Sequence, residues 1–100
     1  SVAAPNRQSA AESHPIALPV MEGLWADLTL KFGAGKLRKA WQQMGRPTDS
    51  VDIARMLASM GMDDDNIRAA FAKAGVGDDV INATMQGVIG HWLPMGAMWR

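Results

Sequence analysis

The sequence predicts an all-α protein, a compact bundle of about five short helices behind a disordered N-terminal leader. Apolar residues recur five times with the i, i+3, i+4, i+7 spacing of one helix face, and glycine, proline or aspartate separates each recurrence from the next. Helices this short are marginal alone and must pack together. The expected division is a leader or linker over residues 1–18, a helical domain over 19–93 and an apolar tail over 94–100.

The five apolar stripes follow the leader in order. They are Met21, Leu24, Trp25, Leu28; Leu37, Ala40, Trp41, Met44; Ile53, Met56, Leu57, Met60; Ile67, Ala70, Phe71, Ala74; and Ile81, Thr84, Met85, Val88 with Trp92. The leader has no such period and is rich in Pro, Ser, Asn, Gln and Ala, as in segments that cannot form a core. A short helical solenoid is the alternative architecture, but the stripes differ more in side-chain size than solenoid repeats do.

Glycine, proline and aspartate define the predicted ends of the helices. The predicted stops are Gly33 with Gly35, Gly45 with Pro47, Gly61, Gly75 and Pro94. The predicted N-caps are Thr48 or Asp49, Asp63, and Gly77 or Asp78, because a capping oxygen accepts free N–H groups of the first turn. The near repeat of residues 61–65 at 75–79 is therefore one helix ending and the next beginning.

Composition excludes several classes of function. The chain has one hundred residues, no net charge and no cysteine, so it can form one modest core and has no disulfide framework or thiolate site. No apolar run approaches the roughly 20 residues of a membrane span, and residues 1–18 lack the pattern of a signal peptide. The compartment stays open. The chain begins at Ser1 and ends on Met-Trp-Arg, and we expect an excised fragment of a larger protein.

The sequence contains no pattern typical of an enzyme, a cofactor site or a metal site. His14 and His91 lie far apart, and neither has a second ligand one helical turn away. The glycine-rich residues 33–36 lack the spacing and the Ser or Thr of a phosphate-binding loop. The acidic residues 63–66 lack the Gly and Glu of a calcium loop. We therefore expect a non-catalytic protein with no cofactor and no metal.

The methionine and tryptophan content favours a protein-docking surface. The chain has eight Met and four Trp, residue types that adaptable interfaces use. The predicted groove is lined by Met60, Met62, Met95, Met98 and Trp99. Its partner is expected to be another protein, with a homodimer as a further alternative.

Residues 51–88 resemble the ubiquitin-associated domain, a compact three-helix module. The resemblance lies in Met60-Gly61-Met62, in the helix ending at residues 70–75 and in a third helix containing Met85. It implies a ubiquitin-binding patch formed by Met60, Gly61 and Met62 together with Met85 and Val88. Met62 departs from the family, which has an aromatic residue there, and the resemblance covers about two-fifths of the chain.

Nucleic-acid binding is the alternative function. Lys36, Arg38 and Lys39 form a basic stretch in the second predicted helix, with Lys31 and Arg46 nearby. Residues 50–71 also have the outline of a helix-turn-helix, whose second helix would enter the major groove. Its first residues are Asp63, Asp64 and Asp65, which would repel phosphate, so protein docking is favoured.

Overall fold

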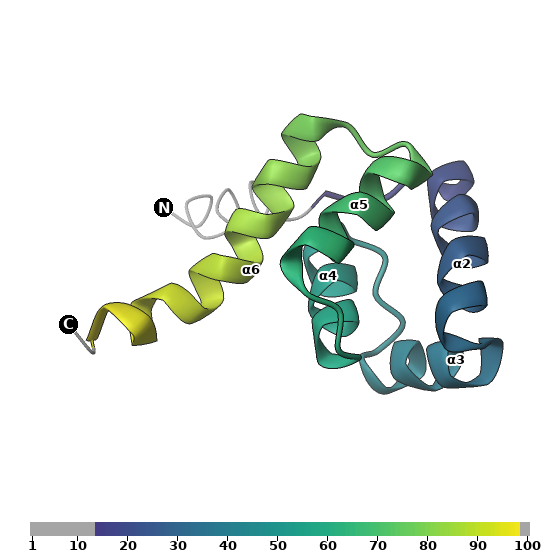
Figure 1. Ribbon diagram of the computed structural model, residues 1–100, viewed down its shortest axis with the longest axis horizontal. Helices are drawn as coiled ribbons and strands as arrows, with labels where there is room; N and C mark the ends of the chain where they lie inside the picture. The colour runs from purple at the N-terminus through teal and green to yellow at the C-terminus, as the bar shows by residue number, and fades with distance from the viewer. Residues whose placement is uncertain (1–13, 99–100) are drawn as a thin grey trace, which may run out of the picture.

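The protein is all-α, as predicted, and five helices follow one another along the part of the chain that the structure describes (Figure 1). The computed structural model describes residues 14–98, and its side chains as far as residue 88. The helices are α2 (Leu18–Phe32), α3 (Ala34–Gln43), α4 (Ser50–Ser59), α5 (Asp64–Ala74) and α6 (Asp78–Met98). None of the described helices combines the length and apolar character needed to cross a membrane.

Helix α5 lies at the centre of the bundle. It packs against α2 on one side and against α4 and α6 on the other, while α4 also packs against α6. Helix α3 packs against the end of α2, and the chain turns sharply between the two helices (Figure 1). The largest fully buried side chain is Phe71 of α5. Residues 44–49 connect α3 to α4.

The apolar stripes of α4, α5 and α6 form most of the core. The fully buried members are Ile53, Met56, Leu57, Ile67, Phe71, Thr84 and Met85. The two earlier stripes are less covered: they fully bury only Leu24, Leu28 and Leu37 and leave Met21, Trp25 and Trp41 half-buried. The stripe prediction is thus confirmed for the second half of the chain, whereas α2 and α3 keep apolar surface at their junction.

Aspartate and glycine shape the helix ends largely as predicted. The Asp49 carboxylate accepts a hydrogen bond from the Asp52 N–H at 3.0 Å, and the Asp63 carboxylate accepts one from the Asn66 N–H at 2.9 Å. Asp49, rather than Thr48, is therefore the cap of α4. Gly75 closes α5 in the left-handed conformation, with φ at 102°, which costs glycine no Cβ clash.

Two predicted boundaries need correction. Pro94 does not stop the last helix, since α6 continues to Met98 and its final turns run away from the other helices (Figure 1). A proline removes one backbone donor, and the chain on both sides of it is helical here. The leader was expected to extend to residue 18, but the chain from residue 14 is held against the bundle and Leu18 begins α2. Residues 1–13 lie outside the described residues.

Helices α4 and α6 meet closely through one polar and one glycine contact. The hydroxyls of Ser50 and Thr84 are both fully buried and lie 2.5 Å apart, so one donates a hydrogen bond to the other. One turn further along α6, a Cβ on Gly87 would lie 3.0 Å from Cγ2 of Val51. The α4–α6 interface thus depends on small side chains and one matched hydroxyl pair.

We predict that the two hydroxyls are coupled energetically. Ser50→Ala should lower the free energy of unfolding by about 1–3 kcal/mol, because it leaves the Thr84 hydroxyl buried without its partner. Thr84→Val should behave similarly, and the double variant should lose less than the sum of the two. Urea unfolding of the four proteins measures this cycle. Strictly additive losses would contradict the pairing.

Candidate functional site

The structure describes the side chains of two residues of the predicted methionine groove, Met60 and Met62. Met62, Met85 and Val88 are buried in the core, so they present no surface to a partner in the folded protein. Met60 is half-buried against that core and Gly61 is exposed in a turn, with φ at 99°. Of the three buried residues, only Met62 belongs to the predicted groove, and the prediction is wrong for it because it packs into the core from the turn between α4 and α5. Met85 and Val88 belong to the patch that the resemblance implies. The side chains of Met95 and Met98 and all of Trp99 lie outside what the structure describes.

The same burial bears on the ubiquitin-binding patch. Three of the side chains that the resemblance would assign to it, Met62, Met85 and Val88, are in the core. They cannot form an apolar surface patch without opening the bundle. The resemblance itself stays a prediction.

The basic residues predicted for the alternative function do lie on the surface. Lys36, Arg38 and Lys39 are all exposed on α3. The Lys36 ammonium lies 5.8 Å from the ring centroid of Phe32, within the range of a cation–π contact. These three residues are therefore accessible to a partner, and the same helix contributes Trp41 to a hollow of the described structure.

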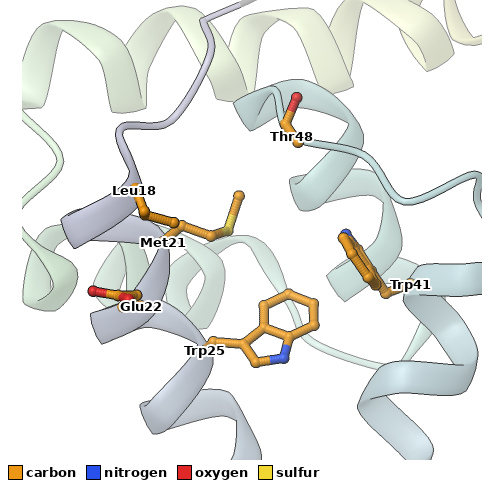
Figure 2. A pocket seen from close by; sticks show the side chains of 6 residues that line it. All are labelled: Leu18, Met21, Glu22, Trp25, Trp41 and Thr48. Carbon is orange, nitrogen blue, oxygen red and sulfur yellow. The ribbon is translucent and has the colours of Figure 1, made fainter.

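That hollow is an apolar cleft between the start of α2, the second half of α3 and the loop that leads to α4 (Figure 2). We call it the tryptophan cleft; it has a volume of about 350 Å³, and it is lined by Leu18, Met21, Glu22, Trp25, Trp41 and Thr48. Leu18 is 69% exposed at its mouth. The sequence predicted none of these residues as a site, and the stripe positions of Met21, Trp25 and Trp41 indicated core.

Two tryptophans form the inner wall of the cleft. Their ring centroids are 5.6 Å apart with an interplanar angle of 69°. This is an edge-to-face arrangement, which aromatic pairs prefer. The Trp41 indole N–H donates a hydrogen bond of 2.9 Å to the carbonyl of Pro47. Met21 and Trp25 both extend toward Trp41 from α2 (Figure 2). Because the indole nitrogen is satisfied and both rings have partners, the Trp41 side chain is fixed before any partner arrives.

A short extended segment holds the cleft open at one end. We call residues 14–17 the strap: the Ile16 N–H donates to the Thr48 carbonyl at 3.0 Å, and the Ser50 N–H donates to the His14 carbonyl at 3.0 Å. Pro15 forms an isolated antiparallel bridge with Asp49. A residue that precedes proline favours extended backbone, which suits His14 to this pairing. The strap places Leu18 and Met21 opposite Thr48.

The loop between α3 and α4 contains a strained residue. Arg46 has φ at 56°, the left-handed region, directly after Gly45 at 82°. A non-glycine residue there costs roughly 1–2 kcal/mol relative to ordinary backbone. The turn lets the Arg46 N–H donate to the Trp41 carbonyl at 2.9 Å and places the carbonyl of Pro47 under the Trp41 indole. Local strain thus supports the wall of the cleft.

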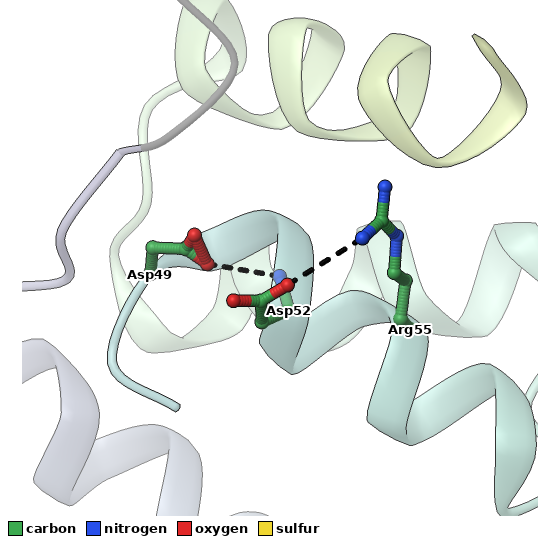
Figure 3. Close-up of polar contacts among 3 residues, drawn as sticks. All are labelled: Asp49, Asp52 and Arg55. Atoms are coloured by element: carbon green, nitrogen blue, oxygen red, sulfur yellow. Dashed lines mark hydrogen bonds and ion pairs between the residues drawn. The ribbon is translucent and has the colours of Figure 1, made fainter. Parts of the chain in front are cut away.

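The acidic residues at the start of α4 serve the helix rather than the cleft. Figure 3 shows the Asp49 carboxylate against the Asp52 N–H, and Arg55 Nη1 at 3.6 Å from the Asp52 carboxylate. Burial raises the pKa of Asp52 above its ordinary value of 3.8, and the neighbouring Asp49 carboxylate raises it further, while Arg55 partly offsets both. The pair therefore has a structural role at the cap.

We predict that Asp52 opposes stability as it ionises. A carboxyl whose pKa is raised on folding binds its proton more tightly in the native state. Its contribution to the free energy of unfolding is therefore present at low pH and is lost as pH rises through the folded pKa. The stability of Asp52→Asn relative to the parent should therefore increase between about pH 3 and about pH 7. The change should be small because the side chain is 47% exposed to screening water. Urea midpoints of both proteins measure it; a relative loss with rising pH would contradict the prediction.

The lining of the tryptophan cleft is mainly apolar. Its lining offers one carboxyl and one hydroxyl, Glu22 and Thr48, beside four apolar side chains. Among residues 14–88, no group of three or more His, Cys, Asp or Glu side chains is placed to hold a metal ion. Comparison of the chain with protein families, with curated proteins and with solved structures finds no match.

Proposed function

We propose that this chain is a non-catalytic protein-docking module, and that the tryptophan cleft receives apolar side chains from a helix of its partner. The observation that carries the proposal is the pair of half-buried tryptophans lining an open apolar cleft. Tryptophan in a central pocket is the residue type that most often dominates binding energy at protein interfaces. This proposed binding surface lies at the junction of α2 and α3, and it shares no residue with the groove predicted from the sequence.

The size and rigidity of the cleft support this use. About 350 Å³ lies within the range of roughly 300–1,000 Å³ that is usual for binding pockets, and it accommodates two or three aliphatic side chains. The walls are fixed by the Trp41–Pro47 hydrogen bond and by the strap, so little ordering is required on binding. An amphipathic helix presents apolar side chains at i, i+4 and i+7, a spacing that suits a groove between two helices.

A neutral peptide tests the proposal in its simplest form. The probe is a helical peptide of about 18 residues, long enough to populate a helix, with leucines at i, i+4 and i+7 and with glutamine and alanine elsewhere. Titrated into the labelled chain, it should shift the indole N–H signals of Trp25 and Trp41. Leu18→Glu should weaken this binding about tenfold or more, because a charge replaces a leucine at the mouth of the cleft.

Leu30→Glu is the matched control. Leu30 is also an exposed leucine of α2, at 86%, but it does not line the cleft. The Leu30→Glu variant should bind the peptide as tightly as the parent chain does. The proposal fails if the two indoles do not respond, or if Leu30→Glu weakens binding as much as Leu18→Glu.

A further inference from the structure

We infer that the partner of the tryptophan cleft is an amphipathic helix with acidic side chains along one flank, the flank that lies over α3. This inference rests on the proposed docking function and adds the charge of the occupant to it. Two independent observations carry it: the segregation of charge around the cleft, and the presence of a strained arginine at its edge.

Charge is strongly segregated around the cleft. Residues 28–48 contain five cationic residues and no acidic one. The five are Lys31, Lys36, Arg38, Lys39 and Arg46. Their segment includes all of α3 and the loop to Thr48, which contribute Trp41 and Thr48 to one wall of the cleft. The wall thus has a positive field although the whole chain has no net charge.

Two of these cations, Arg38 and Arg46, are close along the chain to residues that line the cleft. Arg38 precedes Trp41 by three residues on α3, so the two side chains are neighbours on the helix surface. Arg46 is two residues from Thr48, and its backbone N–H is bonded to the Trp41 carbonyl. Both arginines are exposed, and the ion pairs among the described residues use Arg55 and Lys73 instead. Arg38 and Arg46 are therefore available to carboxylates of a partner.

The conformation of Arg46 adds a second reason. Its φ of 56° is one that glycine or asparagine adopts with less strain, and Gly45 beside it already has a positive φ. The turn alone does not call for an arginine. A contact between the Arg46 side chain and a partner would explain why an arginine occupies this strained position.

The other wall of the cleft sets the direction of the partner. Glu22 lies on the α2 side, with its carboxylate turned away from Trp41 (Figure 2). A helix laid along the cleft therefore meets positive charge over α3 and negative charge over α2. A nucleic-acid strand has phosphates along its whole length, and its bases stack on open ring faces. Here the two tryptophans meet edge to face and a carboxylate stands at the rim, an arrangement that favours a one-sided acidic helix.

Three peptides with the same leucine face test the inference. They have glutamine, glutamate or lysine on the flank expected over α3. At about 0.05 M salt the glutamate peptide should bind about tenfold more tightly than the glutamine peptide, and the lysine peptide more weakly than either. The differences should shrink at about 0.5 M salt, where screening shortens the reach of exposed charges to a few ångströms.

Charge variants of the chain locate the effect. Arg46→Asn keeps a residue that tolerates the left-handed conformation, and Arg38→Gln keeps a good helix former. Each should reduce the preference for glutamate over glutamine severalfold, because each removes one cation beside the cleft. Arg68→Gln removes one charge at a site on α5 that faces Asn82 of α6, and it should keep the full preference.

The outcomes distinguish failure of the acidic-partner inference from failure of the proposed docking function. Equal binding of all three peptides at both salt concentrations would overturn the acidic partner and leave the docking function standing. Loss of binding by all three would overturn both. A single-stranded oligonucleotide that binds more tightly than the glutamate peptide, and shifts Lys36 to Lys39, would replace the acidic helix with a nucleic acid.

Discussion

Two backbone hydrogen bonds, from the Ile16 N–H to the Thr48 carbonyl and from the Ser50 N–H to the His14 carbonyl, connect the beginning of α2 to the beginning of α4. The rest of the site depends on this connection. Without it, α2 would be held by its contacts with α3 and α5 alone, and Leu18 at its first turn would have no fixed position opposite Thr48. The connection closes a loop of some thirty residues, and its closure entropy is offset by burial of Leu24 and Leu28 in the same loop.

The core and the candidate site lie in different parts of the bundle. Helices α4, α5 and the first half of α6 hold the core, through Phe71, Met85 and the Ser50–Thr84 pair. Helices α2 and α3 bury less and retain the aromatic cleft and the cationic surface. Because stability resides mainly in one part, the other can keep exposed apolar side chains and a strained Arg46, features that a protein optimised for stability alone would lack.

The sequence predicted the helices well because their signals are local. Apolar spacing defined the stripes, and Asp63 and Gly75 act at their helix ends by contacts within a few residues. The cleft was not predictable in the same way: Trp25 and Trp41 have the same spacing as core residues, and only the packing of α2 against α3 decides how much of each is covered. Conversely, Met62 and Met85 were assigned to a surface from composition and resemblance, whereas both are buried. Met85 has a stripe position, and Met62 packs into the core from the turn between α4 and α5. The strap escaped prediction because pairing across some thirty residues leaves no local pattern.

The central claim is that the tryptophan cleft is already built in the free protein. Amide hydrogen exchange of the Ile16 and Ser50 N–H groups tests it most directly, with Phe71 in the core as the reference. If the strap is part of the native bundle, both amides should exchange slowly, through openings whose free energy approaches that of the Phe71 amide. Exchange of Ile16 and Ser50 at the rate of an unprotected peptide, with Phe71 still protected, would show a strap that is open in solution and would contradict a preformed cleft.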